Sequence, residues 1–184
     1  VGREPDEQPI EFDTPDGGNN TYDGTGGVPM GDWFTRILYA THFMDLNILL
    51  SDRVNSQSKI LEVREPRDRV RKVAPWLTLD SNIYPAVVDH RLVWIVDGYT
   101  VTRNYPDSQA VSLRQAITDA ETNPDPSTDQ SINYMRNSVK AVVDATNGTV
   151  ELYAWDPSDP ILQTYDKAFP GVLKSADQIS PDLK

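Results

Sequence analysis

The sequence predicts an α+β fold, with a small antiparallel sheet built from two β-hairpins and packed with several amphipathic helices. Two observations predict it. An apolar run, a polar break and a second apolar run follow one another twice, at about 84–100 and at about 140–155, and this order is typical of a β-hairpin. Apolar residues also recur at spacings of three and four over 33–44, as on one face of a helix.

The chain divides by composition into an arm and a domain. Residues 1–31 hold seven carboxylates against one base, Arg3, and seven of the ten glycines. Such an acidic, Gly/Pro-rich segment cannot bury enough apolar surface to fold alone. We therefore predict an arm or linker over 1–31 and a single α+β domain over 32–184.

The first predicted elements are a helix, a strand and a second helix. Asp32 is placed to cap the helix over 33–44, since a carboxylate there accepts from the first free N–H groups. Weak alternation over 58–63 predicts a strand. Pro66 suits the first turn of the second helix, which Pro75 stops.

The hairpins come next along the chain. In the first, residues 92–96 are all apolar, as expected of a strand that is covered on both faces. Residues 103–130 contain three prolines and are predicted to be mostly loop. A helix is predicted over 130–137, leading into the second hairpin, and a last helix over 160–169 is closed by the Pro-Gly pair that follows.

The turn residues of the second hairpin predict a specific strand register. A two-residue turn at Asn147-Gly148 suits type I′ geometry. That turn would pair Val143 with Leu152 and would bring Asp144 opposite Glu151. A longer turn with a bulge at Gly148 would shift this register by one residue.

Composition excludes several classes of function. The chain has no cysteine, which excludes disulfides, thiol nucleophiles and cysteine-bound metals. A net charge of −11 repels phosphate backbones, so no nucleic-acid partner is expected. No run approaches the roughly 20 apolar residues of a membrane helix, and no leader opens the chain. The chain as written is predicted to be soluble.

Five strings in the chain carry a resemblance to one family. They are KVAPWLTLD (72–80), YPAVVD (84–89), WIVDGYT (94–100), YMRNSVKAVVD (134–144) and LYAWD (152–156). Together they resemble an uncharacterised family of large multi-pass membrane proteins found chiefly in actinobacteria, over about residues 12–183. The resemblance implies a soluble, extracytoplasmic segment of a much larger protein of the cell membrane. It implies no activity and no catalytic motif. Members of this family often have glycine at the position of His90.

Surface aromatic residues are the first candidate contacts for a ligand or partner. We single out Trp94, Tyr99, Tyr105, Tyr153 and Trp155. Rings of this kind stack on sugars, although on a pleated sheet they more often pack in the core or across strands. Tyr153 and Trp155 could lie on the face of the second hairpin opposite its apolar face. In that case either another element covers them or they form an exposed contact patch.

A basic cluster is the second candidate. Arg64, Arg67 and Arg71 lie in a basic run that would bind anionic lipid head groups. Each positive charge would contribute about 1 kcal/mol to the free energy of binding. The alternative is a solvated helix, in which Glu65 and Asp68 pair with the basic residues four positions later.

The third candidate is the carboxylate pair Asp144 and Glu151. Two opposed carboxylates can bind a hard cation or share a proton; the alternative is a solvated hairpin tip that Asp144 caps. The acidic run from Asp13 to Asp23 lacks the spacing of a calcium loop. With two unrelated histidines and no nucleophile motif, we predict no catalytic residues, no metal and no cofactor.

These observations predict a non-enzymatic module of unknown function. Its expected partners are the remainder of the parent membrane protein or an envelope protein, and it would meet the membrane only through the parent chain. One alternative is a binder of a cell-envelope sugar or lipid head group through the surface aromatics. Another is a fragment of an enzyme completed elsewhere in the parent.

Overall fold

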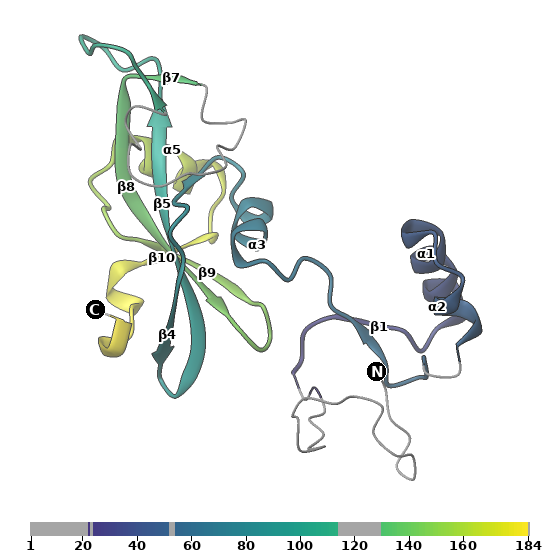
Figure 1. Ribbon diagram of the computed structural model, residues 1–184. Coiled ribbons are helices and arrows are strands. Elements are labelled where there is room, and N and C mark those ends of the chain that lie inside the picture. The colour runs from purple at the N-terminus through teal and green to yellow at the C-terminus, as the bar shows by residue number, and fades with distance from the viewer. Residues whose placement is uncertain (1–21, 23, 52–53, 114–129, 184) are drawn as a thin grey trace. The chain divides into compact units, whose positions relative to one another are not determined.

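The computed structural model describes residues 22, 24–51, 54–113 and 130–183, and the chain falls into two compact units, Val1–Glu62 and Val63–Lys184 (Figure 1). Of the predicted arm, residues 1–21 and 23 lie outside the described residues. The boundary falls after Glu62 and not after Gly31. The reason is a strand pair that joins 28–29 to 59–60 and so keeps everything between them in the first unit.

The first unit holds two helices between two very short strands. These elements are β1 (Val28–Pro29), α1 (Trp33–Phe43), α2 (Asn47–Leu50) and β2 (Lys59–Ile60). The Asp32 carboxylate accepts from the Thr35 N–H at 3.1 Å, which confirms the predicted cap. Helix α1 ends at Phe43, and the C-cap residue Met44 that follows has a left-handed φ of 53°. The strand predicted over 58–63 is only two residues long.

The second unit is built on a six-stranded sheet. Its strands are β3 (Thr78–Leu79), β4 (Tyr84–Val88), β5 (Arg91–Thr102), β8 (Tyr134–Asp144), β9 (Val150–Ala154) and β10 (Leu173–Ser175). The order is β10-β9-β8-β5-β3, and β4 also pairs with β5. All pairs are antiparallel except β10 with β9, which are joined through helix α5 (Pro160–Ala168). The predicted α+β class is confirmed.

The helix predicted over 130–137 is wrong. These residues belong to β7 (Ser131–Ile132) and to the start of β8, while β6 (Val111–Ser112) pairs with β7. Strand β8 pairs with β5 from Tyr134 opposite Thr102 onward. This long ladder supplies hydrogen bonds and burial that outweigh the local helical pattern.

The first hairpin turns at Asp89 and His90. Both residues have positive φ, 50° and 63°, and the strands pair from Tyr84 opposite Ile95 to Val88 opposite Arg91. A two-residue loop with two left-handed residues is the type I′ geometry. The hairpin is confirmed, and the left-handed φ of His90 is a conformation in which glycine is less strained.

His90→Gly is expected to raise the free energy of unfolding by about 1 kcal/mol, because it removes the Cβ from a left-handed residue. Urea unfolding tests this in a Trp33→Phe background, where the three remaining tryptophans all lie in the second unit. His90→Ala is the matched control and keeps the Cβ. An equal increase in the free energy of unfolding in both variants would show that the removal of the Cβ is not the cause.

The second hairpin has a longer turn than predicted. Val143 pairs with Val150 and Ala141 with Leu152, two positions away from the predicted register. Residues 145–148 form the loop, and Gly148 has a φ of 69°. A shift of two keeps every side chain on its predicted face. It also separates Asp144 from Glu151, which instead lies opposite Val142.

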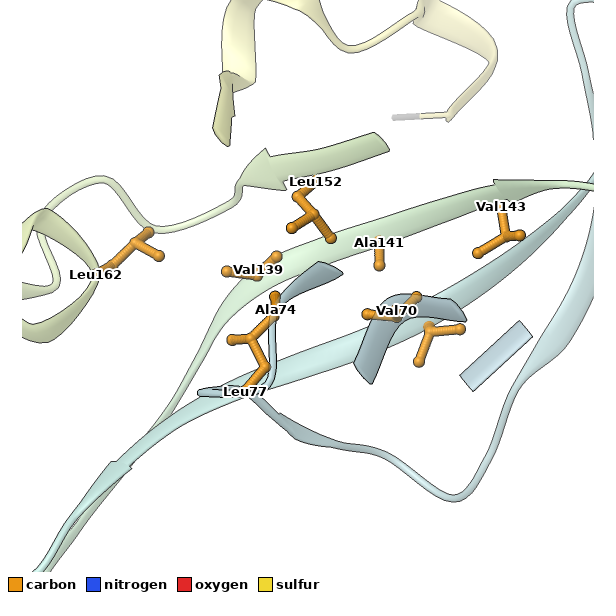
Figure 2. Packing of buried hydrophobic residues seen from close by; sticks show 9 residues of the cluster. Val70, Ala74, Leu77, Val139, Ala141, Val143, Leu152 and Leu162 are labelled. Carbon is orange, nitrogen blue, oxygen red and sulfur yellow. The ribbon is translucent and has the colours of Figure 1, made fainter. Parts of the chain in front are cut away.

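One face of the sheet is covered by α5 and by α3 (Pro66–Val73) (Figure 1). Glu65 caps α3 by accepting from the Asp68 N–H at 2.9 Å. Figure 2 shows how α3 and α5 contribute Val70 and Leu162 to the core. The full set of buried residues in this cluster is Val70, Ala74, Leu77, Val96, Val139, Ala141, Val143, Leu152 and Leu162.

The other face is covered by the C-terminal segment. Two 3₁₀-helices, η2 (Ala176–Gln178) and η3 (Pro181–Leu183), follow β10. Ile179 between them is 4% exposed. It packs in a cluster with Val88, Val93, Ile95, Val142 and Tyr153, against which Ala176 and Leu183 also lie. The central strand is thus covered on both faces, as its apolar run predicts, although Leu92 at its start stays half exposed.

Candidate functional site

The face that carries Tyr153 and Trp155 is covered in part. Tyr153 is 6% exposed, because it packs in the cluster that the C-terminal segment closes. Trp155 lies beyond this cover and is 43% exposed. The Lys140 ammonium lies 5.5 Å from the centroid of the Trp155 ring, within reach of a cation–π interaction. Of this pair, Trp155 alone offers a ring to a partner.

The remaining three aromatic candidates are dispersed. Trp94 packs half-buried against the α3 face of the sheet. The Tyr99 hydroxyl donates to Asp80 at 3.2 Å, and burial, followed by the Asp80 charge, raises the pKa of Tyr99 to about 12. Tyr105 stacks on Tyr134 with ring centroids 4.8 Å apart. The structure does not gather the five rings into one platform, and their role as contacts stays a prediction.

Glu151 lies in a network of charges across neighbouring strands. It accepts from the Lys174 ammonium and from the Tyr153 hydroxyl, both at 2.6 Å. The hydrogen bond from Lys174, with help from that of Tyr153, holds the pKa of Glu151 below its ordinary value. Burial and the neighbouring Glu151 raise the pKa of Tyr153 to about 12. These groups satisfy one another, which is the behaviour of a structural network.

The carboxylate pair does not form. Asp144 accepts from the N–H groups of Thr146 and Asn147 at 2.9 and 2.7 Å, and the Arg91 guanidinium is 3.4 Å away. The alternative in which Asp144 caps its turn is therefore the one that holds. Asp144 is nonetheless 7% exposed rather than solvated. The longer loop is the reason that the predicted pair is wrong.

The basic cluster lies on α3 and directly before it. Arg71 lies 3.6 Å from Asp68, three residues earlier rather than four. Arg69 donates to the Gly148 carbonyl oxygen at 2.7 Å and so ties α3 to the β8–β9 turn. Arg64 and Arg71 are exposed and Arg67 is half-buried. The structure thus gives one arginine of the run a structural role, and the head-group contacts of the others stay a prediction.

A buried carboxylate was missed by sequence reasoning. Asp159 is fully buried and accepts from the hydroxyls of Thr100, Ser138 and Tyr134. It also caps α5 by accepting from the Ile161 N–H at 2.9 Å. Burial alone raises the pKa of Asp159, but these hydrogen bonds outweigh it and the pKa lies below its ordinary value. An aspartate before Pro160, at a helix start, was the available signal.

An apolar surface on the two helices of the first unit was also missed. Met44 is 93% exposed, Leu50 76% and Phe34 65%. We call this set the α1–α2 apolar surface; its members are Trp33, Phe34, Leu38, Phe43, Met44, Leu46 and Leu50. The three- and four-residue spacing predicted an amphipathic helix. In the structure Ala40 is the buried residue of α1, and most of the large side chains face outward.

A pocket of about 150 Å³ lies in the same unit. Its lining residues are Met30, Ile48, Val54, Ser58, Lys59 and Ile60. Ile48 belongs to α2, between Leu46 and Leu50 of the α1–α2 apolar surface. None of the five aromatic candidates lines it.

Among the described residues, no helix has the length and apolar character needed to cross a bilayer.

The comparisons with known proteins point to one family. The profile of an uncharacterised protein family, UPF0182, matches residues 1–184. A UPF0182 protein of Saccharopolyspora erythraea is 51% identical over the whole chain, which corresponds to 19% of that relative. UPF0182 proteins of Corynebacterium jeikeium and Thermobifida fusca are 50% and 51% identical over 96% and 90% of the chain, and 18% and 17% of their own lengths. The chain thus spans about a fifth of these curated relatives. No solved structure matches.

Proposed function

This chain belongs to the uncharacterised protein family UPF0182, and we propose that it serves there as a non-enzymatic docking module. It would contact the remainder of the much longer parent chain. The function of the family is unknown, so the proposal rests on the surfaces of the module itself. Nucleic acid is an unsuitable partner for a chain with a net charge of −11.

The observation that carries the proposal is the α1–α2 apolar surface. Its seven large side chains are each between 48% and 93% exposed. Large exposed apolar side chains in this number, on two short helices that contact each other, are typical of a contact site in soluble proteins. Burying one such side chain contributes about 1.5–3 kcal/mol, so several together are enough to hold a docked arrangement.

The location is also a proposal. We infer that the module lies on the extracytoplasmic side of the cell membrane and is attached through the parent chain. The resemblance of its five sequence strings to a family of multi-pass membrane proteins supports this placement.

A second candidate function is binding of a cell-envelope ligand. It is favoured by Trp155, whose exposed ring lies beside the Lys140 ammonium. An aromatic face next to a charged donor suits a sugar. An enzyme fragment has less support, because the most buried carboxylate among the described residues, Asp159, already accepts from three hydroxyls.

Cysteine labelling tests the docking proposal. The chain has no cysteine, so Met44→Cys introduces a unique thiol within it. In the isolated chain this thiol is expected to react with a maleimide at the rate of an exposed site. In the full-length parent, cleared of other cysteines, the rate is expected to fall about tenfold or more, since a docked site reacts only when it opens.

The control is Lys167→Cys, at an exposed position on α5, which is expected to react at similar rates in both proteins. Equal rates for Met44→Cys in the isolated and full-length proteins would refute docking through the α1–α2 apolar surface.

A further inference from the structure

The pocket in the first unit is held in shape by hydrogen bonds to the main chain of Met30. The Met30 N–H donates to the Ser58 carbonyl oxygen at 2.8 Å. The Met30 carbonyl oxygen in turn accepts from the Arg36 guanidinium at 2.6 Å. Met30 is itself 1% exposed and forms a buried part of the lining. The Met30 part of the lining is therefore tied to α1 and to the residue before β2 before any partner arrives, which lowers the entropic cost of binding.

The polar side chains of the lining already have partners. The Ser58 hydroxyl accepts from the Asn55 N–H at 3.0 Å. The Lys59 ammonium donates to the Gly24 carbonyl oxygen at 2.9 Å and lies 5.7 Å from the centroid of the Tyr22 ring. What remains for an occupant is the apolar lining of Met30, Ile48, Val54 and Ile60. A lining of this kind favours an apolar group over a sugar or a head group.

We propose that this pocket receives one apolar side chain, of the size of leucine or phenylalanine, from the remainder of the parent chain. The proposal rests on the docking function above and names the chemistry of its anchor. The pocket volume of about 150 Å³ is large enough for a benzene-sized group. Interfaces concentrate their binding energy in such buried anchors, surrounded by contacts that exclude water.

The choice of occupant follows from chain length. The chain spans about a fifth of its relatives, so in a parent of their length the other four fifths would be covalently tethered to it. Tethering gives a segment of the parent a high effective concentration at the pocket, provided that the geometry permits contact. A second copy of the chain has no such advantage.

The first test uses benzene as the probe on the isolated chain. Methyl NMR signals of Ile48, Val54 and Ile60 are expected to shift saturably, with a dissociation constant on the order of a millimolar. Val54→Phe fills the pocket and is expected to abolish the shifts of the two isoleucines. Val73→Phe makes the same change at an exposed position of α3, in the second unit, and is expected to leave them. Absence of a saturable shift in the wild-type chain would overturn the proposal.

The second test places the same two variants in the full-length parent, with Leu50→Cys as the labelling reporter. Val54→Phe is expected to return the labelling rate to within about twofold of the isolated chain, because the anchor is excluded. Val73→Phe is expected to keep the reporter protected. Protection that survives Val54→Phe would overturn the anchor and leave docking intact. A reporter that is unprotected even in the wild type would refute the docking function itself. Urea unfolding of both variants checks that each is folded.

Discussion

Asp159→Ala is expected to lower the free energy of unfolding of the second unit by about 4 kcal/mol. The substitution removes the cap of α5, which contributes about 1 kcal/mol. It also leaves the buried hydroxyls of Thr100 and Ser138, and that of Tyr134, without their charged acceptor. Each such loss costs about 1–3 kcal/mol. Urea unfolding followed by tryptophan fluorescence in the Trp33→Phe background measures the effect.

Two control variants distinguish the effect of losing the hydrogen-bond network from the effects of charge and of helix propensity. Asp166→Ala makes the same change at an exposed position of α5, and it is expected to change stability by less than about 0.5 kcal/mol. Asp159→Asn keeps the size but replaces one acceptor oxygen by a donor, and it is expected to remain strongly destabilising. A loss for Asp159→Ala no larger than that of Asp166→Ala would show that the network contributes nothing.

The same network predicts a pH dependence. The pKa of Asp159 in the folded protein lies below its ordinary value. Its contribution is therefore fully present above the unfolded pKa of about 3.9 and is lost as the pH falls through the folded value. The difference in stability between wild type and Asp159→Ala is expected to shrink below about pH 4. A difference that stays constant down to pH 2 would contradict this assignment.

Ile179→Ala is expected to lower the free energy of unfolding by about 3 kcal/mol. Ile179 is the buried residue with which the C-terminal segment covers Tyr153 and Val142. Its truncation leaves a cavity that the short 3₁₀-helices cannot easily fill. The same urea experiment measures the loss, and near-ultraviolet circular dichroism reports whether the tyrosine surroundings loosen.

Leu92→Ala is the control for Ile179→Ala. Leu92 belongs to the same sheet but is 50% exposed, so its truncation is expected to cost less than about 1 kcal/mol. If the two variants lose the same free energy, the C-terminal segment is not an integral cover of the sheet.

Much of the local structure could be predicted from the sequence. Asp32, Pro66 and Pro160 each stand at a helix start, and the structure begins a helix at or directly after each of them. Both hairpins could be predicted because alternation and turn residues act within a few positions of one another. The faces of β8 and β9 could also be predicted, since a register shift of two leaves every face unchanged.

The candidate site was less predictable. The α1 helix was foreseen, but its spacing alone does not say whether the apolar face meets a core or stays exposed. The five aromatic rings do not form the hypothesised platform, because Trp94 and Tyr153 pack in separate clusters on opposite faces of the sheet. The carboxylate pair does not form because the loop over 145–148 is longer than predicted and sets a different register; a residue from outside the hairpin, Arg69, donates to the Gly148 carbonyl oxygen in this loop.

The sequence by itself determined the α+β class, the hairpins, the helix starts and the family to which the chain belongs. Each of these depends on contacts between neighbours in the chain or on strings of residues that can be compared directly. Only the tertiary structure decided that 134–144 is a strand, that Asp159 binds hydroxyls of residues up to 59 positions away, and that the C-terminal segment covers Tyr153. These features come from non-local pairing and burial, whose free energy exceeds the local preferences of the segments involved.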